Sequence, residues 1–138
     1  LKGRWQKLQD NPLLICDTGH NTGAWALLQK ELMQLNKEHL HIIFGVANDK
    51  DIAHILDFLP KEATYYWTRA SVDRALNEKE LASQARARNL NGDTYATVKE
   101  AFEAAYKNSK PKDAIFIGGS NFIVADFLTN NISKVDRL

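Results

Sequence analysis

Short apolar runs alternate with segments of helical spacing along this chain of 138 residues. The apolar or β-branched runs predict buried strands at 13–16, 39–45, 63–68 and 114–118. Apolar positions three and four residues apart predict helices that begin at 22 or cover 52–59, 78–88, 99–107 and 122–128. This alternation favours a mostly parallel, Rossmann-like α/β sheet of about five or six strands with helices on both faces.

Three further segments have weaker patterns. Residues 5–8 are strand-like and precede the turn at Asn11 and Pro12, so we expect them at a sheet edge. Residues 94–97 can supply one more short strand, and the chain from Asn130 onward is expected to fray. The sequence contains no internal repeat and no low-complexity linker, and its length fits a single domain.

Composition narrows the classes of partner. The chain has 18 Lys and Arg residues against 17 Asp and Glu residues, so no charge excess directs it to nucleic acid or a membrane surface. No apolar run is long enough to span a bilayer, and the first residues lack the order of a signal peptide. Cys16 is the only cysteine, which excludes an internal disulfide, and its place in a predicted buried strand disfavours a nucleophilic role. We therefore expect a cytoplasmic protein.

The densest polar cluster is Asp17-Thr18-Gly19-His20-Asn21, directly after the first apolar strand. In a parallel α/β sheet, ligands bind beyond the carboxyl ends of strands, where helix amino termini offer free N–H groups to anions. One interpretation is that Asp17 or Asn21 only caps the following helix. Capping needs neither an imidazole nor a second polar side chain, so the full set favours a ligand site.

Other loops follow predicted strands and should meet at the same edge of the sheet. Residues 45–51 include Lys50, which could neutralise a phosphate or lie at a solvated helix start. Residues 118–121 begin with Gly-Gly-Ser, which lets backbone amides approach a carboxylate or phosphate but also makes an ordinary tight turn. Arg74, in the loop after the third strand, either reaches this crevice or pairs with Glu78.

Two other kinds of site are disfavoured. His39, His41 and His54 lack clustered Cys or carboxylate residues at ligand spacing, so we expect no metal site in this chain. The three tryptophans lack interleaved basic residues. We therefore expect them in the core or on the sheet rather than as a stacking platform for nucleic acid bases.

Five short motifs follow one another along the chain. They are Gly3-Arg4-Trp5-Gln6, Asp17-Thr18-Gly19-His20-Asn21, the loop 45–51 with Asp49-Lys50-Asp51, Arg74-Ala75 and Gly119-Ser120-Asn121-Phe122. In content, order and spacing this series resembles the carboxyl-terminal domain of folylpolyglutamate synthase/dihydrofolate synthase, within the Mur ligase superfamily. The resemblance covers nearly the whole chain. Thr18-Gly19 stands where the family more often has Gly-Ala, and we expect this change to adjust the turn without abolishing the nucleotide contact.

The resemblance implies ATP-dependent amide ligation. A pteroate or folate carboxylate is activated as an acyl phosphate, which the amino group of L-glutamate then attacks. In such enzymes the phosphate-binding P-loop and the Mg²⁺ ligands belong to a larger amino-terminal domain, and this chain has no Gly-x-x-x-x-Gly-Lys-Ser/Thr sequence. Because the chain also begins without Met, we expect residues 1–138 to be one carboxyl-terminal domain, cut from a two-domain enzyme and inactive alone.

The resemblance also implies roles for single residues. The residues expected to contact ATP are Arg4, Asp17, His20, Asn21 and Lys50. Those expected to bind the incoming glutamate are His20, Ser120 and Arg74. The partners implied are the P-loop ATPase domain of the same protein and small-molecule substrates, and no residue of this chain is expected to perform the chemistry by itself.

Two alternatives remain open at the level of sequence. A cell-wall amino-acid ligase of the same superfamily shares the Asp-x-x-His pattern and the glycine-serine turn, although residues 49–51 favour the folate branch. A non-enzymatic α/β module could use the same crevice for a small anion, because such folds host many functions. Dihydrofolate synthase, folylpolyglutamate synthase and an enzyme with both activities are not distinguished, since the pteridine pocket lies mainly outside this chain.

Overall fold

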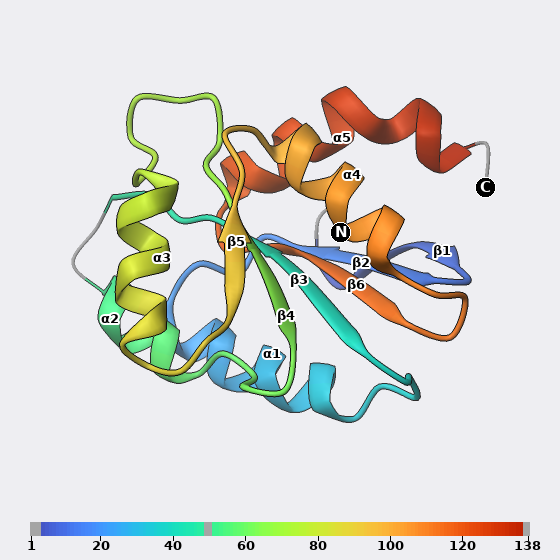
Figure 1. Cartoon of the computed structure of the whole chain (residues 1–138), viewed down its shortest axis with the longest axis horizontal. Coiled ribbons are helices and arrows are strands. Elements are labelled where there is room, and N and C mark those ends of the chain that lie inside the picture. The colour runs from blue at the N-terminus through green and yellow to red at the C-terminus, as the bar shows by residue number, and fades with distance from the viewer. Residues whose placement is uncertain (1–3, 49–50, 137–138) are drawn as a thin grey trace.

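The computed structural model describes residues 4–48 and 51–136, without the side chains of residues 131–136. These residues form a six-stranded sheet and five helices (Figure 1). The strands are β1 (Gln6–Asp10), β2 (Leu13–Asp17), β3 (Leu40–Phe44), β4 (Thr64–Trp67), β5 (Gly92–Thr94) and β6 (Ala114–Gly118). The helices are α1 (Thr22–Met33), α2 (Ile52–Asp57), α3 (Glu78–Arg86), α4 (Val98–Asn108) and α5 (Asn121–Asp136).

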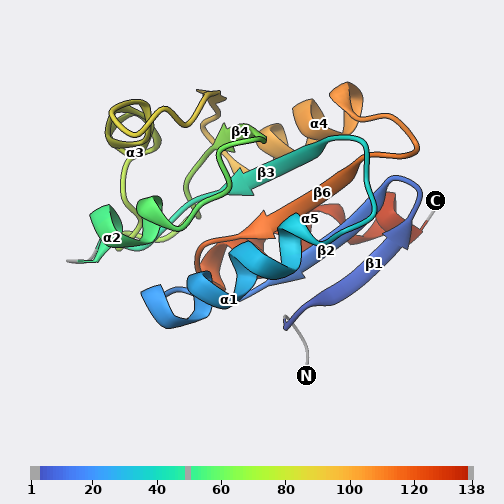
Figure 2. The same ribbon diagram turned by 90° about the horizontal axis from the view of Figure 1, so that it is seen from below.

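The strands lie in the order β1-β2-β6-β3-β4-β5. All neighbouring pairs except β1 and β2 are parallel, as predicted. β1 pairs with β2 in the antiparallel sense, because the two residues between them leave no room for a crossover. The predicted edge position of residues 5–8 is confirmed, although the strand begins at Gln6. Figure 2 shows β1 running against β3 and β6, so its amino-terminal end lies where the parallel strands end.

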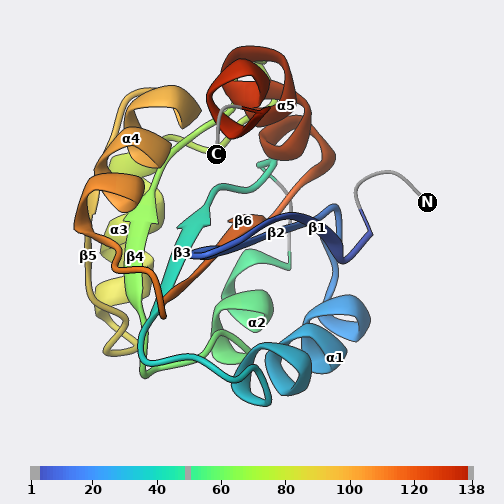
Figure 3. The same cartoon turned by 90° about the vertical axis from the view of Figure 1, so that its right-hand side faces the viewer.

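Helices cover both faces of the sheet (Figure 3). The crossovers through α1, α2 and α3 all advance along the sheet in one direction, and these helices pack with one buried cluster. The crossover through α4 returns from β5 to β6, and α4 packs with α5 on the second cluster. Because β-α-β crossovers are right-handed, a reversal of direction moves the helix to the other face.

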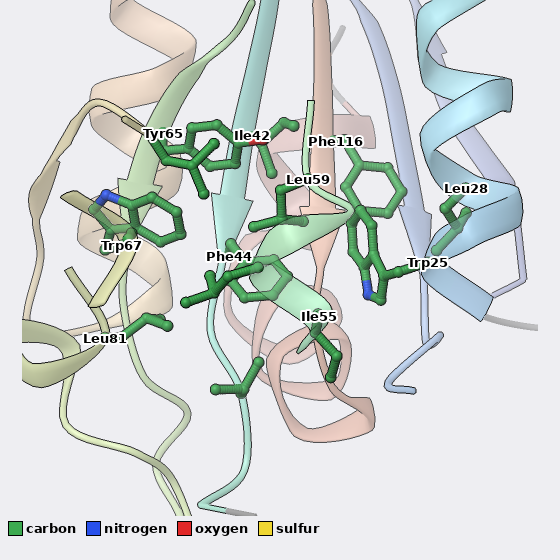
Figure 4. Packing of buried hydrophobic residues seen from close by; sticks show 14 of the residues in the cluster. Trp25, Leu28, Ile42, Phe44, Ile55, Leu59, Tyr65, Trp67, Leu81 and Phe116 are labelled. Atoms are coloured by element: carbon green, nitrogen blue, oxygen red, sulfur yellow. The ribbon is translucent and has the colours of Figure 1, made fainter. Parts of the chain in front are cut away.

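Large aromatic side chains fill the core under α1 and α2 (Figure 4). Trp25 of α1 packs edge-on against Phe44 and Phe116, with ring centroids 5.4 and 5.5 Å apart. Tyr65 and Trp67 of β4 stack with their centroids 4.6 Å apart. β3 and β6 are buried along their whole length because helices cover both faces, and this explains their nearly continuous apolar sequences.

The short strand predicted at 94–97 instead spans Gly92–Thr94, so that prediction was wrong in position. β4 and β5 approach closely at Gly92, where a Cβ atom would lie 2.0 Å from the carbonyl oxygen of Tyr65. Thr97 belongs to the next element, because its side-chain oxygen accepts a hydrogen bond from Glu100 N at 3.1 Å and caps α4.

The end of the chain also differs from the prediction of a frayed tail from Asn130 onward. α5 continues to Asp136, and neither Gly nor Pro interrupts the segment 121–136. α3 ends at Arg86, two residues earlier than predicted. Within the described ranges, no helix combines the length and the apolar character needed to cross a membrane.

Candidate functional site

Three adjacent strands end together at one edge of the sheet. Asp17 of β2 and Phe44 of β3 both pair with Gly118 of β6. The chain then leaves β2 for α1 on one face of the sheet and leaves β6 for α5 on the other (Figure 3). Loops that diverge in this way leave a crevice at the strand ends, which is where open α/β sheets bind ligands.

Asp17 holds two backbone segments at this edge. Its Oδ1 accepts a hydrogen bond from Gly19 N at 2.7 Å, and its Oδ2 accepts one from Trp5 N at 2.8 Å. The carboxylate therefore shapes the turn after β2 and joins it to the segment ahead of β1. Arg4 belongs to that segment and lines the crevice beside the same turn.

Asn21 is the N-cap of α1, since its Oδ1 accepts a hydrogen bond from Ala24 N at 2.8 Å. The capping interpretation is therefore correct for Asn21, whereas Asp17 makes the two contacts described above. Asn21 is exposed and also lines the crevice. Because the cap occupies its oxygen, its amide nitrogen is the group that can meet a ligand.

The first of two pockets in the crevice has a volume of about 420 Å³. Its lining consists of Arg4, Asp17, Thr18, Gly19, His20, Asn21, Ala24, Leu27, Leu28, Glu31 and Asn121. The pocket combines an exposed guanidinium with an apolar wall from α1, where Leu27 is 61% exposed. This volume lies in the range of small-molecule sites, and the lining suits a ligand with both anionic and apolar parts.

The second pocket adjoins the first and has a volume of about 210 Å³. Its lining consists of His20, Ala47, Arg74, Gly119, Ser120, Asn121 and Phe122. His20 and Asn121 line both pockets. The His20 side chain is exposed, and its Nδ1 lies 3.4 Å from the carbonyl oxygen of Thr18.

The turn after β6 is built by one glycine and one serine. Gly119 has a φ of +108°, and a Cβ atom there would lie 2.1 Å from the carbonyl oxygen of Gly45, so only glycine fits. Ser120 is buried, and its Oγ accepts a hydrogen bond from Ile123 N at 3.2 Å. The turn therefore packs closely against the chain after β3 and caps α5 at the floor of the second pocket.

Arg74 reaches the crevice, which decides between the two sequence-based alternatives. Its carbonyl oxygen accepts a hydrogen bond from Asn48 N at 2.6 Å, and an isolated bridge joins Ala47 to Ala75. These contacts dock the loop after β4 on the loop after β3. Among the described residues, no ion pair joins Arg74 to Glu78.

Three further expectations concerned Lys50, Cys16 and a metal site. Lys50 lies outside the described residues. Cys16 is buried, and burial, with a smaller contribution from the nearby Asp17 carboxylate, raises the pKa of its thiol to about 11. A thiol held protonated is a poor nucleophile. In the described part of the chain, no group of three or more His, Cys, Asp or Glu side chains could hold a metal ion.

Several residues that line the crevice were given no site role from the sequence, among them Asn121, Leu27 and Glu31. Asn121 lines both pockets, and its place directly after the Gly-Gly-Ser turn was a usable signal. Leu27 fits the apolar spacing of α1, yet its side chain is exposed and lines the first pocket. Glu31 follows Leu27 by one helical turn and shares its face.

A comparison with protein families matches residues 3–121 to the model described as "Mur ligase, glutamate ligase domain". The match covers most of the chain. The chain belongs to this family. The resemblance stated from the five sequence motifs is therefore confirmed at the level of the family.

The curated proteins that the chain matches include two dihydrofolate synthase/folylpolyglutamate synthases. The chain is 27% identical to the dihydrofolate synthase/folylpolyglutamate synthase of Buchnera aphidicola subsp. Schizaphis graminum over 94% of its length and 31% of that protein. It is 30% identical to the protein of the same name from Escherichia coli over 91% of its length and 29% of that protein. The chain thus spans about a third of the length of these relatives.

Solved structures share the fold. The Escherichia coli FolC complex with DHPP and ADP matches with a TM-score of 0.87 at 26% identity, over 100% of this chain and 32% of that one. A Yersinia pestis folylpolyglutamate synthase/dihydrofolate synthase with Mn, AMPPNP and L-glutamate bound matches with a TM-score of 0.84 at 27% identity, over 94% and 31%. The α/β architecture predicted from sequence is therefore confirmed.

Proposed function

We propose that this chain is the carboxyl-terminal part of an ATP-dependent ligase that joins L-glutamate to dihydropteroate, to a folate, or to both. The observation that carries the proposal is the pair of adjoining pockets that share His20 and Asn121, one bordered by Arg4 and the other by Arg74. Ligation brings a phosphoryl donor and an amino acid to one carboxyl group, so neighbouring sites for two anionic ligands suit it. The names of the relatives and the ligands in the Yersinia pestis structure support the same assignment.

The reaction has two steps. An oxygen of the folate or pteroate carboxylate attacks the γ-phosphorus of ATP, the bond to the bridging oxygen breaks, and ADP leaves. The amino nitrogen of glutamate then attacks the acyl carbon, phosphate leaves with its oxygen, and the nitrogen loses a proton as the amide forms. Phosphoryl transfer depends mostly on positioning and charge neutralisation, so the residues of this chain serve by holding the ligands.

We assign the first pocket to ATP and call it the nucleotide pocket. Arg4 supplies a planar guanidinium that can bind a phosphate with two parallel hydrogen bonds. His20 and Asn21 complete the polar wall, with Asp17 behind them, and the apolar wall of α1 receives the remainder of the nucleotide. Lys50 completes the set proposed from the sequence, as a further positive charge for phosphate.

We assign the second pocket to L-glutamate and call it the glutamate pocket. Arg74 can pair with a carboxylate of the amino acid. Ser120 accepts a backbone hydrogen bond with its Oγ, and its hydroxyl hydrogen can still be donated to a ligand. His20 lies between the two pockets, where it can contact both substrates.

The remaining parts of the site belong to another domain of the parent protein. The sequence has no P-loop motif, and the described residues offer no cluster that could ligate Mg²⁺. We therefore assign the P-loop and the Mg²⁺ ligands to an amino-terminal ATPase domain, whose metal would neutralise phosphate charge. Closure of that domain over this crevice excludes water, which would otherwise hydrolyse the acyl phosphate. The isolated chain is accordingly expected to be inactive.

Titration of the chain with ADP, followed by amide chemical shifts, tests the nucleotide assignment. The shifts should cluster at Arg4, Asp17, His20 and Asn21, and shifts confined to other surfaces would refute the assignment. An assay of the chain alone with ATP, L-glutamate and dihydropteroate should show no turnover. Appreciable unaided ligation would refute the fragment interpretation.

The alternatives predict different results with the parent protein. Ligase activity with dihydropteroate or tetrahydrofolate as the acceptor supports the folate branch, and activity with a cell-wall precursor instead supports the other branch of the superfamily. A non-enzymatic anion-binding module predicts no P-loop domain in the reading frame upstream of Leu1. Separate assays of the two folate acceptors distinguish the two folate activities.

A further inference from the structure

The loop after β4 carries Arg74 across the edge of the sheet from one face to the other. Ala70 is buried in the cluster under α4 and α5, and Val72 packs partly against the same cluster. Leu76 is buried in the cluster under α1, α2 and α3. Arg74 lies between these two anchored parts and lines the glutamate pocket. The position of its guanidinium therefore depends on how the loop is held on both faces.

Backbone contacts hold the loop on the side of Leu76. The Leu76 N–H donates to the carbonyl oxygen of Val46 at 3.0 Å, and the Asn48 N–H donates to the carbonyl oxygen of Arg74 at 2.6 Å. These hydrogen bonds join backbone groups of the loops after β3 and β4, so they require no particular side chain.

On the other face, a single side chain of α5 holds the loop. The Oδ2 of Asp126 accepts a hydrogen bond from Ser71 N at 2.7 Å, and its Oδ1 accepts one from Ser71 Oγ at 3.1 Å. Both carboxylate oxygens thus bind one residue of the loop, and paired charge-assisted hydrogen bonds fix orientation as well as distance. Ser71 is exposed, so water could replace both contacts at little cost to the core. Their effect is to fix the loop.

The helix that carries Asp126 also shapes the glutamate pocket. Ser120 directly precedes α5, Asn121 begins it, and both residues line this pocket. Asp126 lies about one and a half turns further along the same helix. Neither Ser71 nor Asp126 lines either pocket of the crevice. Through α5, the contact therefore sets the arginine-bearing loop in a fixed relation to the floor of the pocket.

We propose that Asp126 is a positioning residue for the incoming amino acid: it fastens the loop of Arg74 to α5 through Ser71 and touches no substrate itself. This inference rests on the proposed function, because it takes Arg74 to bind a carboxylate of L-glutamate. Without the contact the loop would sample more positions, and the amino acid would have to order it on binding. Loss of the contact therefore weakens the binding of L-glutamate more than it slows the reaction of the bound substrate.

The parent enzyme provides the test, through initial rates at varied L-glutamate and at varied ATP. Asp126→Ala should raise the KM for L-glutamate about fivefold, leave the KM for ATP unchanged and change kcat by less than about twofold. A merely structural role would reduce the amount of active enzyme and change neither KM, and that result overturns the proposal. Glu103→Ala removes an exposed carboxylate from the neighbouring helix α4 and serves as the matched control, with both KM values unchanged.

The conservative variant separates the geometry of the contact from the charge of the carboxylate. The amide of Asp126→Asn can accept the Ser71 N–H with its oxygen and donate to Ser71 Oγ with its nitrogen. Its KM for L-glutamate should stay within about twofold of the wild-type value, because both contacts are kept. A KM as high as that of Asp126→Ala would assign the effect to the charge and overturn positioning. Ser71→Ala keeps only the backbone hydrogen bond and should raise the KM less than Asp126→Ala does.

Arg74→Ala separates this inference from the function on which it rests. If the parent enzyme does not ligate L-glutamate, or if Arg74→Ala leaves the KM for L-glutamate unchanged, the glutamate assignment fails and the positioning role fails with it. If Arg74→Ala raises this KM and Asp126→Ala does not, positioning alone is overturned. Adding Asp126→Ala to Arg74→Ala should cause no further rise, because the positioned group is already absent. Independent, multiplicative rises would contradict positioning.

Discussion

Polar side chains gather at both ends of the sheet, but those at one end are buried and hydrogen-bonded to one another, whereas those at the other end are exposed. At the amino end, His41 Nε2 lies 3.0 Å from Asp113 Oδ2 and its Nδ1 lies 2.9 Å from Tyr66 Oη. Asn108 Nδ2 donates to the same Tyr66 oxygen, and the Lys110 N–H donates to Asp113. At the carboxyl end, Arg4 and Arg74 are exposed and line pockets. One end is a closed network, and the other offers its charges to a ligand.

Burial accounts for this difference. His41 is 4% exposed and Asp113 6% exposed, so each needs a partner within the protein. A hollow of about 500 Å³ also borders Asp113 at the amino end, so the presence of a hollow does not by itself mark the functional edge. What marks it is polar groups that stay exposed where loops diverge to opposite faces.

The largest effect is expected at the closed end. Asp113→Ala leaves His41 buried without its carboxylate partner, which should lower the free energy of unfolding by about 3 kcal/mol. ADP affinity per folded molecule should not change. Urea unfolding and an ADP titration measure the two quantities, with the exposed-site variant Asp10→Ala as the control. A stability loss below that of the control would show that the network is not closed as described.

The reverse pattern is expected at the open end. Arg4→Ala should change the free energy of unfolding by less than about 0.5 kcal/mol, because the side chain is exposed. It should weaken ADP binding by about tenfold, since a charge-assisted contact is lost. Arg74→Ala should leave ADP binding unchanged and raise the KM for glutamate in the parent enzyme. Equal effects of both variants on ADP would contradict the division into two pockets.

A smaller effect concerns acidification. Burial lowers the pKa of His41 below its ordinary value of 6.5, and the nearby His39 lowers it further. The hydrogen bond to Asp113 and the attraction of that carboxylate oppose this shift without cancelling it. Burial raises the pKa of Asp113, but the hydrogen bonds from His41 and the Lys110 amide outweigh this and the net pKa is lowered. The unfolded chain therefore binds more protons than the folded chain as the pH falls.

The contribution of His41 to the free energy of unfolding should be fully present above pH 6.5 and should decline below that pH, as His41 of the unfolded chain takes up a proton. The contribution of Asp113 should be lost at lower pH, where carboxyl groups of the unfolded chain take up protons. Urea midpoints measured at neutral and mildly acidic pH test this. His41→Gln should remove the first decline, whereas His20→Gln, at the exposed histidine of the open end, should retain it. An unchanged first decline in His41→Gln would assign it to another group.

The smallest effect is expected on α1. Leu27→Asn should change the free energy of unfolding by less than about 0.5 kcal/mol, because the side chain is 61% exposed. Leu28→Asn, one residue on and buried, should be strongly destabilising. Thermal unfolding of the two variants tests whether Leu27 belongs to the pocket wall rather than to the core. A large loss of stability in Leu27→Asn would show that the side chain is part of the core.

Much of the fold could be predicted because it depends on local pattern. The runs at 13–16 and 114–118 are strands in the structure, and the turn at 17–21 leads into α1. The strand predicted at 94–97 was misplaced because contacts distant in sequence set its position. Gly92 lies in β5, close to the Tyr65 backbone of β4, and Thr97 caps α4. Of the site residues proposed from sequence, all but Lys50, which lies outside the described residues, line one or both pockets.

The amino-acid pattern was enough to predict the kinds of element, the places where strands turn into helices, and a series of motifs that marks the family. These features depend on residues close together in the chain. Three features came from the folded chain alone. β1 runs antiparallel to β2 and brings the segment of Arg4 to Asp17, and the loop with Arg74 joins the second pocket. His41 meets Asp113, which is 72 residues away in the sequence. Those contacts follow from strand order and handed crossovers, because two segments far apart in sequence meet only where the assembled sheet places them.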